Sequence, residues 1–180
     1  MTSSLEIRAA GETDLGAFFA YLDDHLSDNG SADTALFMPM ARSASRFGPE
    51  RAAAFRAGVG TPLGHPGWRR LWLALDSRGA IAGHIDLRAR PEAAAAHRAM
   101  LGMGVHRDRR KAGLGERLVG AAAQWAALNA LAWIDLEVLA VNAGARRLYS
   151  RCGFVQTGQI EDMFRIDGEA LAYTAMSLKL

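Results

Sequence analysis

The stretch from Val105 to Gly115 constrains the fold of this chain more than any other part of its sequence. It leaves a short apolar segment, passes through a cluster of basic residues, and ends in two glycines that open an amphipathic helix. A helix N-terminus exposes backbone N–H groups without intrahelical partners and the positive end of the helix dipole, so it suits a phosphate group. Gly113 and Gly115 lack the Cβ atoms that would hold an anion away, and the basic residues 109–111 supply charge. The sequence therefore predicts an anion site between a strand and a helix.

A second ordered pattern runs from residue 133 to residue 154. Ile134, Leu136 and Val138 alternate with Asp135, Glu137 and Leu139, which predicts a strand whose two faces differ in polarity. Asn142 is a good N-cap for the helix that follows, and Gly153 is placed to end that helix. One face of this helix carries Ala145, Leu148, Tyr149 and Cys152. From these residues alone, Asn142 is a helix cap and Tyr149 a core aromatic.

These two segments together resemble the GCN5-related N-acetyltransferase (GNAT) superfamily. Residues 110–115 resemble its Arg/Gln-x-x-Gly-x-Gly/Ala pyrophosphate signature, and residues 136–154 resemble its L-x-V-x-x-x-N-x-x-A-x-x-L-Y-x-x-x-G-F strand, helix and turn. Other phosphate loops fit less well, because no Gly-Lys-Ser/Thr follows the glycines and their spacing is not that of a dinucleotide-binding loop.

The resemblance implies an α+β fold, with a mixed, mostly antiparallel twisted sheet flanked by helices. Two central parallel strands of this acyl-CoA N-acyltransferase fold splay apart to admit the pantetheine arm, and here they are expected at Met100–Val105 and Trp133–Ala140. The likeness extends over nearly the whole chain as a single N-acetyltransferase domain, 1–180, and is weakest over Ser27–Gly67.

The implied activity is transfer of the acetyl group of acetyl-CoA to a primary amine, by direct attack in a ternary complex. A noncatalytic acyl-CoA-binding regulatory module is the alternative, and it would need no titratable group in the cleft. The family's acceptors range from protein amines to small molecules, so the acceptor stays open. Four acidic residues lie in or beside the loop after the first predicted helix: Asp23, Asp24, Asp28 and Asp33. Their charge is consistent with attraction of a cationic amine, and equally with a solvated acidic loop.

The resemblance also implies which residues bind acetyl-CoA and protonate the departing thiolate. Gly102 and Gly104 are expected to leave room for pantetheine, with a β-bulge as the other explanation. Tyr149 is expected to be the proton donor. The expected cofactor-binding set is Met103, Gly104, Val105, Arg109, Arg110, Lys111, Ala112, Gly113, Leu114, Gly115, Asn142, Ala145 and Tyr149.

The general base is not settled by the sequence. Many family members place a Glu on the strand before the pyrophosphate loop, but Met100–Val105 holds no carboxylate. The candidates are Glu137, with Asp135 on the same face, and His84, with Asp86 on the same face. For each of these four residues there is a simpler explanation than catalysis, namely that it is a hydrogen-bonded polar residue of a half-buried strand.

Hydrophobic periodicity and turn residues predict the remaining elements. They are a strand at Leu5–Ile7, a helix capped by Thr13 or Asp14, a loop over Ser27–Gly48, a helix over Pro49–Ala57, a loop over Gly58–Gly67, a hairpin of Trp68–Asp76 and Ala80–Arg90, a helix over Gly113–Leu128, and a terminal hairpin of Ile160–Asp167 and Glu169–Leu180.

Composition limits the classes of function. The net charge of the 180-residue chain is only +2 and its bases are locally clustered, which favours one anion site over a nucleic-acid surface. The single cysteine, Cys152, excludes an internal disulfide, and no apolar run is long enough to span a membrane. We therefore expect a cytoplasmic protein. The resemblance implies that it uses acetyl-CoA and no metal, and it is compatible with a homodimer.

Overall fold

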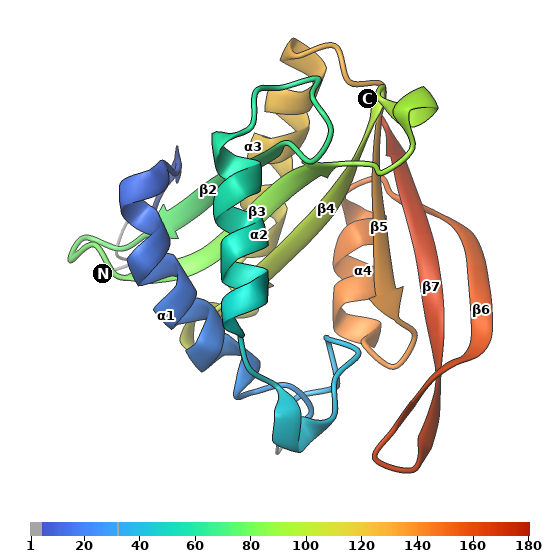
Figure 1. Cartoon of the computed structure of the whole chain (residues 1–180). Coiled ribbons are helices and arrows are strands. Elements are labelled where there is room, and N and C mark those ends of the chain that lie inside the picture. The colour runs from blue at the N-terminus through green and yellow to red at the C-terminus, as the bar shows by residue number, and fades with distance from the viewer. Residues whose placement is uncertain (1–4, 32) are drawn as a thin grey trace.

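In the computed structural model, which describes residues 5–31 and 33–180, the chain forms one seven-stranded sheet in the order β1-β2-β3-β4-β5-β7-β6 (Figure 1). Neighbouring strands are antiparallel except β4 and β5, which are parallel. The strands are β1 (Glu6–Ala9), β2 (Arg69–Leu75), β3 (Ile81–Ala89), β4 (Arg98–Val105), β5 (Trp133–Leu139), β6 (Val155–Ile166) and β7 (Glu169–Lys179). The helices are α1 (Leu15–Leu26), α2 (Pro49–Gly60), α3 (Leu114–Leu128) and α4 (Ala143–Arg151). This is the mixed α+β sheet that the sequence predicts.

The helices cover the sheet in two layers. Helices α1 and α2 lie on one face, while α3 and α4 lie behind the other (Figure 1). Leu114 and Leu118 of α3 are buried against Ile85 and Ile134 of the sheet in the largest apolar cluster. Since burying one such side chain contributes about 1.5–3 kcal/mol, the apolar stripe of α3 fixes this helix, and the loop before it, on the sheet.

Strands β4 and β5 splay as expected. Their pairing is limited to Arg98 with Trp133, Ala99 with Ile134 and Met100 with Asp135. Beyond Met100, β4 pairs with β3 and β5 pairs with β7, so the facing edges of β4 and β5 have no partner strand.

A buried carboxylate, Asp135, binds side chains from neighbouring strands at the end where β4 and β5 still pair. Asp135 accepts hydrogen bonds from Arg98 Nε at 2.7 Å, Arg90 Nε at 3.1 Å and Ser177 Oγ at 2.7 Å. Burial opposes ionisation of Asp135, but hydrogen bonds from Arg98, Ser177 and Arg90 hold its pKa below the ordinary value. Asp135 is therefore a structural carboxylate, and the pair of candidates on β5 reduces to Glu137.

The structure corrects several predicted boundaries and one predicted cap. Strand β1 continues to Ala9, beyond the predicted end at Ile7, and β4 begins at Arg98, before the predicted start at Met100. Helix α2 continues to Gly60, beyond the predicted end at Ala57, and Gly58 there packs tightly: a Cβ on it would lie 2.9 Å from the carbonyl oxygen of Gly67. Strand β6 begins at Val155 and not at Ile160; its register shifts twice, so its side chains do not alternate. The side chain of Asp14 does not cap α1, because its carboxylate accepts from the Gly11 N–H and binds Arg8.

The terminal hairpin turn forms as predicted. Asp167 and Gly168 both adopt positive φ, 52° and 85°, which a type I′ turn requires. Among the described residues, no helix combines the length and the apolar composition needed to cross a membrane.

Candidate active site

The open edge of β4 presents main-chain groups to the gap. His106 N–H donates to Ala82 O on β3, and the register makes every second β4 residue point its main chain the same way. Gly104 therefore directs its main chain toward β3, whereas Met103 and Val105 direct theirs toward the gap. Of the three β4 residues in the expected cofactor-binding set, Met103 and Val105 are therefore oriented to bind pantetheine through the main chain, and Gly104 is not.

The loop before α3 has the backbone shape of an anion site. Lys111 and Gly113 have positive φ, 59° and 75°, and Ala112 between them does not. Such alternation turns successive N–H groups toward one point. Gly113 is the N-cap of α3 and supplies no side-chain cap, so the first N–H groups of the helix have no side-chain acceptor there. This geometry agrees with the predicted pyrophosphate site.

The two glycines of this loop have different roles. A Cβ on Gly113 would meet nothing within 4 Å, so Gly113 is required by its left-handed φ and leaves its surroundings open. A Cβ on Gly115 would lie 2.7 Å from Cδ2 of Leu148. Gly115 therefore lets α3 approach α4, which is a different reason from the clearance around an anion that the sequence suggested.

Most of the loop's arginines bind carboxylates from other segments. Arg110 donates to Val105 O at 3.2 Å and to Asp28 Oδ2 at 3.0 Å. Arg107 binds Asp28 and Asp24, and Arg109 lies 3.4 Å from Asp76. Within the described residues, Lys111 forms no ion pair.

These ion pairs also change the interpretation of the acidic segment after α1. Asp24 and Asp28 are the counter-charges of the loop arginines, and Asp23 accepts the Phe47 N–H at 3.1 Å. They are thus neither a free acidic patch nor a purely solvated loop. The segment that follows α1 is tied to the predicted pyrophosphate loop.

We expect Arg110→Ala to weaken acetyl-CoA binding by about 1.5–3 kcal/mol, the range for a hydrogen bond to a charged group. Calorimetry gives the Kd directly. Asp28→Asn is the matched control: it keeps Arg110 and removes a carboxylate that competes with phosphate, so binding should be as tight as in the wild type or tighter. Equal weakening in both variants would mean that Arg110 anchors the segment after α1 and does not contact the pyrophosphate.

Helix α4 begins and ends as predicted. Asn142 Oδ1 accepts the Ala145 N–H at 3.2 Å, so Asn142 is an N-cap, and Gly153 follows the helix with a φ of 92°. Cys152 lies half-buried against the main core, as expected for a structural thiol.

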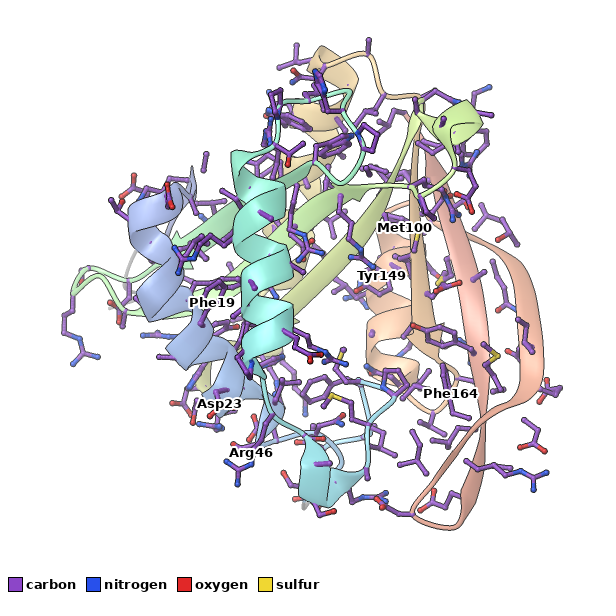
Figure 2. The ribbon with its side chains drawn as sticks, viewed as in Figure 1. Phe19, Asp23, Arg46, Met100, Tyr149 and Phe164 are labelled. Atoms are coloured by element: carbon purple, nitrogen blue, oxygen red, sulfur yellow. The ribbon has the colours of Figure 1, made fainter. Side chains whose placement is uncertain are left out.

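Tyr149 on α4 is buried, and its ring lies 5.6 Å from that of Phe154. Its hydroxyl makes no hydrogen bond to any of the residues described. Burial raises the pKa of this phenol, so it is fully protonated at neutral pH and able to donate. In the view of Figure 2, Tyr149 on α4 is seen through the gap where β4 and β5 diverge, and it packs in the core cluster with Leu136 and Val138 of β5.

We expect Asn142→Ser to leave the melting temperature unchanged, because Ser caps as well as Asn, while Asn142→Ala should cost about 1 kcal/mol of stability. Thermal unfolding of both variants beside kcat/KM measures this. Lost activity in the Ser variant at an unchanged melting temperature would assign the amide a contact with the donor substrate in addition to the cap.

Two residues that the sequence analysis did not single out, Tyr21 and His25, lie beside His84 on the α1 face. The Tyr21 hydroxyl donates to Gly104 O at 3.3 Å and lies 3.4 Å from His84 Nδ1. Burial and nearby Arg110 lower the pKa of His25 to about 4, and burial puts that of His84 well below its ordinary value. Both rings are neutral at pH 7. The helical period that buries Phe18 and Leu22 also predicts burial of Tyr21 and His25, so this signal was available.

The structure does not bring the two candidate bases together. His84 is buried on β3 under α1, whereas Glu137 is exposed on β5 and lines a cavity of about 300 Å³ with Met100 and Asp135. Of the two, Glu137 is therefore the candidate that solvent can reach.

Comparisons with known proteins agree with this fold. The Acetyltransferase (GNAT) family model matches residues 43–154, and no curated protein matches the chain at a significant level. A GNAT-family acetyltransferase from Streptococcus pneumoniae is 24% identical, with a TM-score of 0.79 over 98% of this chain and 100% of that one. An Acinetobacter baylyi putative acetyltransferase is 20% identical, with a TM-score of 0.82 over 100% and 95%.

A third solved structure contains the donor. It is a phosphinothricin acetyltransferase from Sinorhizobium meliloti in complex with AcCoA, 18% identical, with a TM-score of 0.76 over 98% of this chain and 88% of that one. At such identities the solved structures show a shared fold. The family match covers well over half of the chain and includes both the predicted pyrophosphate loop and Tyr149. The chain therefore belongs to the acetyltransferase (GNAT) family, the enzymes that transfer an acetyl group from acetyl-CoA to an amine.

Proposed function

We propose that this protein transfers the acetyl group of acetyl-CoA to a primary amine by direct attack in a ternary complex. The observation that carries the proposal is the arrangement of the site: the open edge of β4 leads to the left-handed loop at Gly113, and α4 behind the splay carries Tyr149, whose hydroxyl has no hydrogen-bond partner among the described residues. A thioester whose pyrophosphate is held at the loop and whose arm follows β4 would bring its sulfur to this opening. A purely acyl-CoA-binding module would have no need for a protonated phenol there.

The chemistry divides among three groups. The main-chain N–H groups of Met103 and Val105, which face the gap, are the candidates to hold the pantetheine arm and to polarise the thioester carbonyl. The amine nitrogen attacks the carbonyl carbon, so that a C–N bond forms and the C–S bond breaks. Tyr149 gives its proton to the departing sulfur. The nitrogen must lose a proton to a base on the acceptor side.

A panel of amines tests the proposal. The purified protein is incubated with acetyl-CoA and one amine at a time, and free thiol is measured. The panel contains peptides with free α-amines, lysine peptides, polyamines, aminoglycosides and phosphinothricin, the last because the printed name of the Sinorhizobium meliloti enzyme contains it. We expect amine-dependent thiol release and an acetylated product by mass spectrometry. Tight acetyl-CoA binding without thiol release for any amine would favour the regulatory module.

A further inference from the structure

The two glycines in β4 make room for titratable side chains, and not only for a ligand. Strand β4 has no bulge there, since the β3–β4 register is regular from Gly83 to Ala89. A Cβ on Gly104 would lie 2.6 Å from His25 Nε2, and a Cβ on Gly102 would lie 2.7 Å from Asp86 Oδ1. The Asp86 carboxylate therefore leans across β4 at Gly102, two residues beyond the last β4 residue that pairs with β5.

The Asp86 carboxylate is buried without the hydrogen bonds that a buried carboxylate normally receives. Asp86 is only 5% exposed, and its enclosed Oδ2 atom accepts no hydrogen bond from any of the residues that the structure describes. Arg69 Nε at 3.5 Å and Arg88 Nη1 at 3.7 Å are within ion-pair range but form no hydrogen bond to it.

Asp135 lies on the same face of the sheet and provides a comparison, because it is a buried carboxylate with a structural role. It is equally buried, but Arg98, Arg90 and Ser177 donate hydrogen bonds to it. Leaving a buried polar group unsatisfied costs about 1–3 kcal/mol of stability, so Asp86 destabilises the fold. An unsatisfied buried group in a folded protein calls for an explanation, and a catalytic role is one such explanation.

We infer that Asp86 takes the proton from the acceptor amine, an inference that rests on the acetyltransferase function proposed above. The amine nitrogen forms the C–N bond and passes its proton to the Asp86 carboxylate, while Tyr149 gives its proton to the sulfur of the breaking C–S bond. Solvent returns the proton from Asp86 to Tyr149 between turnovers. Asp86 lies on the α1 and α2 face and Tyr149 on the α3 and α4 face, so base and acid approach the opening from opposite sides.

The surroundings of Asp86 suit this role better than those of its rivals. Burial raises its pKa, and Arg69 and Arg88 oppose the rise without cancelling it, so the carboxylate is a stronger base than a free one. His84 is paired with Gly104, farther along β4, its Nδ1 lies beside the Tyr21 hydroxyl, and its depressed pKa makes it a weak base. Glu137 is exposed on the cavity wall and has no comparable burial.

Asp86→Asn keeps the shape of the side chain and removes its basicity. We expect kcat to fall about 10²–10⁴-fold, the usual contribution of a general base, with the Kd for acetyl-CoA unchanged. The pH profile gives a readout that a structural role would not move. Wild-type kcat/KM should rise with pH as Asp86 ionises in the field of Arg69 and Arg88, beside a His84 ring that stays neutral, and this acidic limb should disappear in the variant.

Asp135→Asn is the matched control. It breaks a satisfied buried carboxylate, so it should lower the melting temperature and keep the acidic limb. Two results would overturn the inference and leave the acetyltransferase function in place. One is a fall in kcat for Asp86→Asn that equals the loss of folded protein, and the other is an acidic limb that stays unchanged in this variant. Absence of thiol release in the wild type would instead remove the proposed function itself.

Discussion

Tyr149→Phe is expected to lower kcat about 10²–10³-fold and to leave the Kd for acetyl-CoA near its wild-type value. The substitution keeps the ring, its contact with Phe154 and the helix, and removes only the hydroxyl. Because that hydroxyl has no hydrogen-bond partner among the described residues, its removal leaves no protein group unsatisfied. Its interaction with the donor strengthens as charge develops on sulfur, so the loss should appear in turnover and not in ground-state binding.

The measurement compares kcat, acetyl-CoA affinity and melting temperature for the purified variant. The melting temperature should hardly change, since no buried hydrogen bond is lost. Full turnover in Tyr149→Phe would remove the phenol from the mechanism and leave water, or unassisted departure of the thiolate, in its place. Loss of affinity together with turnover would mean that Tyr149 positions the donor and does not protonate it.

Local patterns predicted the parts of this site that depend on neighbours in the sequence. The cap at Asn142 and the helix end at Gly153 each follow from residues a few positions apart, whereas Gly113 was predicted only to leave room for an anion and its left-handed φ is a finding of the structure. The splay of β4 from β5 is not local, and its prediction came from the resemblance to a family.

The contacts that change the interpretation join distant segments. Arg110 and Asp28 are 82 residues apart in sequence, and Tyr21 and Gly104 are 83 apart. No period or spacing within one element reports such pairs, so the acidic residues after α1 could not be recognised as counter-charges of the loop. For the same reason, Gly102 and Gly104 were assigned to pantetheine clearance, although the side chains that fill their space come from β3 and α1.

The position of the base shows the same limit. Alternation along β3 correctly placed His84 and Asp86 on one face, but it gives no information on which of them is satisfied. The difference lies in the third dimension: His84 has Tyr21 beside it, whereas Asp86 has two guanidinium groups within ion-pair range and no donor in hydrogen-bonding geometry. A sequence that lacks a carboxylate on β4 can thus carry one over β4 from the adjacent strand.

Gly113→Val is expected to raise the Kd for acetyl-CoA more than about 100-fold. A left-handed φ of 75° costs an ordinary residue about 1–2 kcal/mol, and more when it is β-branched. Relief of that strain would turn the loop N–H groups away from the pyrophosphate, where each charge-assisted hydrogen bond contributes about 1.5–3 kcal/mol.

Two variants in the same helix separate this effect from general damage. Gly120→Val should bind acetyl-CoA normally, because a Cβ there meets nothing within 4 Å and Gly itself is a poor helix former. Gly115→Val should lower the melting temperature, because its side chain would collide with Leu148 where α3 packs on α4. Calorimetric titration with acetyl-CoA, beside thermal unfolding of all three, decides the matter. Wild-type affinity in Gly113→Val would show that the pyrophosphate is bound elsewhere, since no valine can hold the backbone shape on which this site depends.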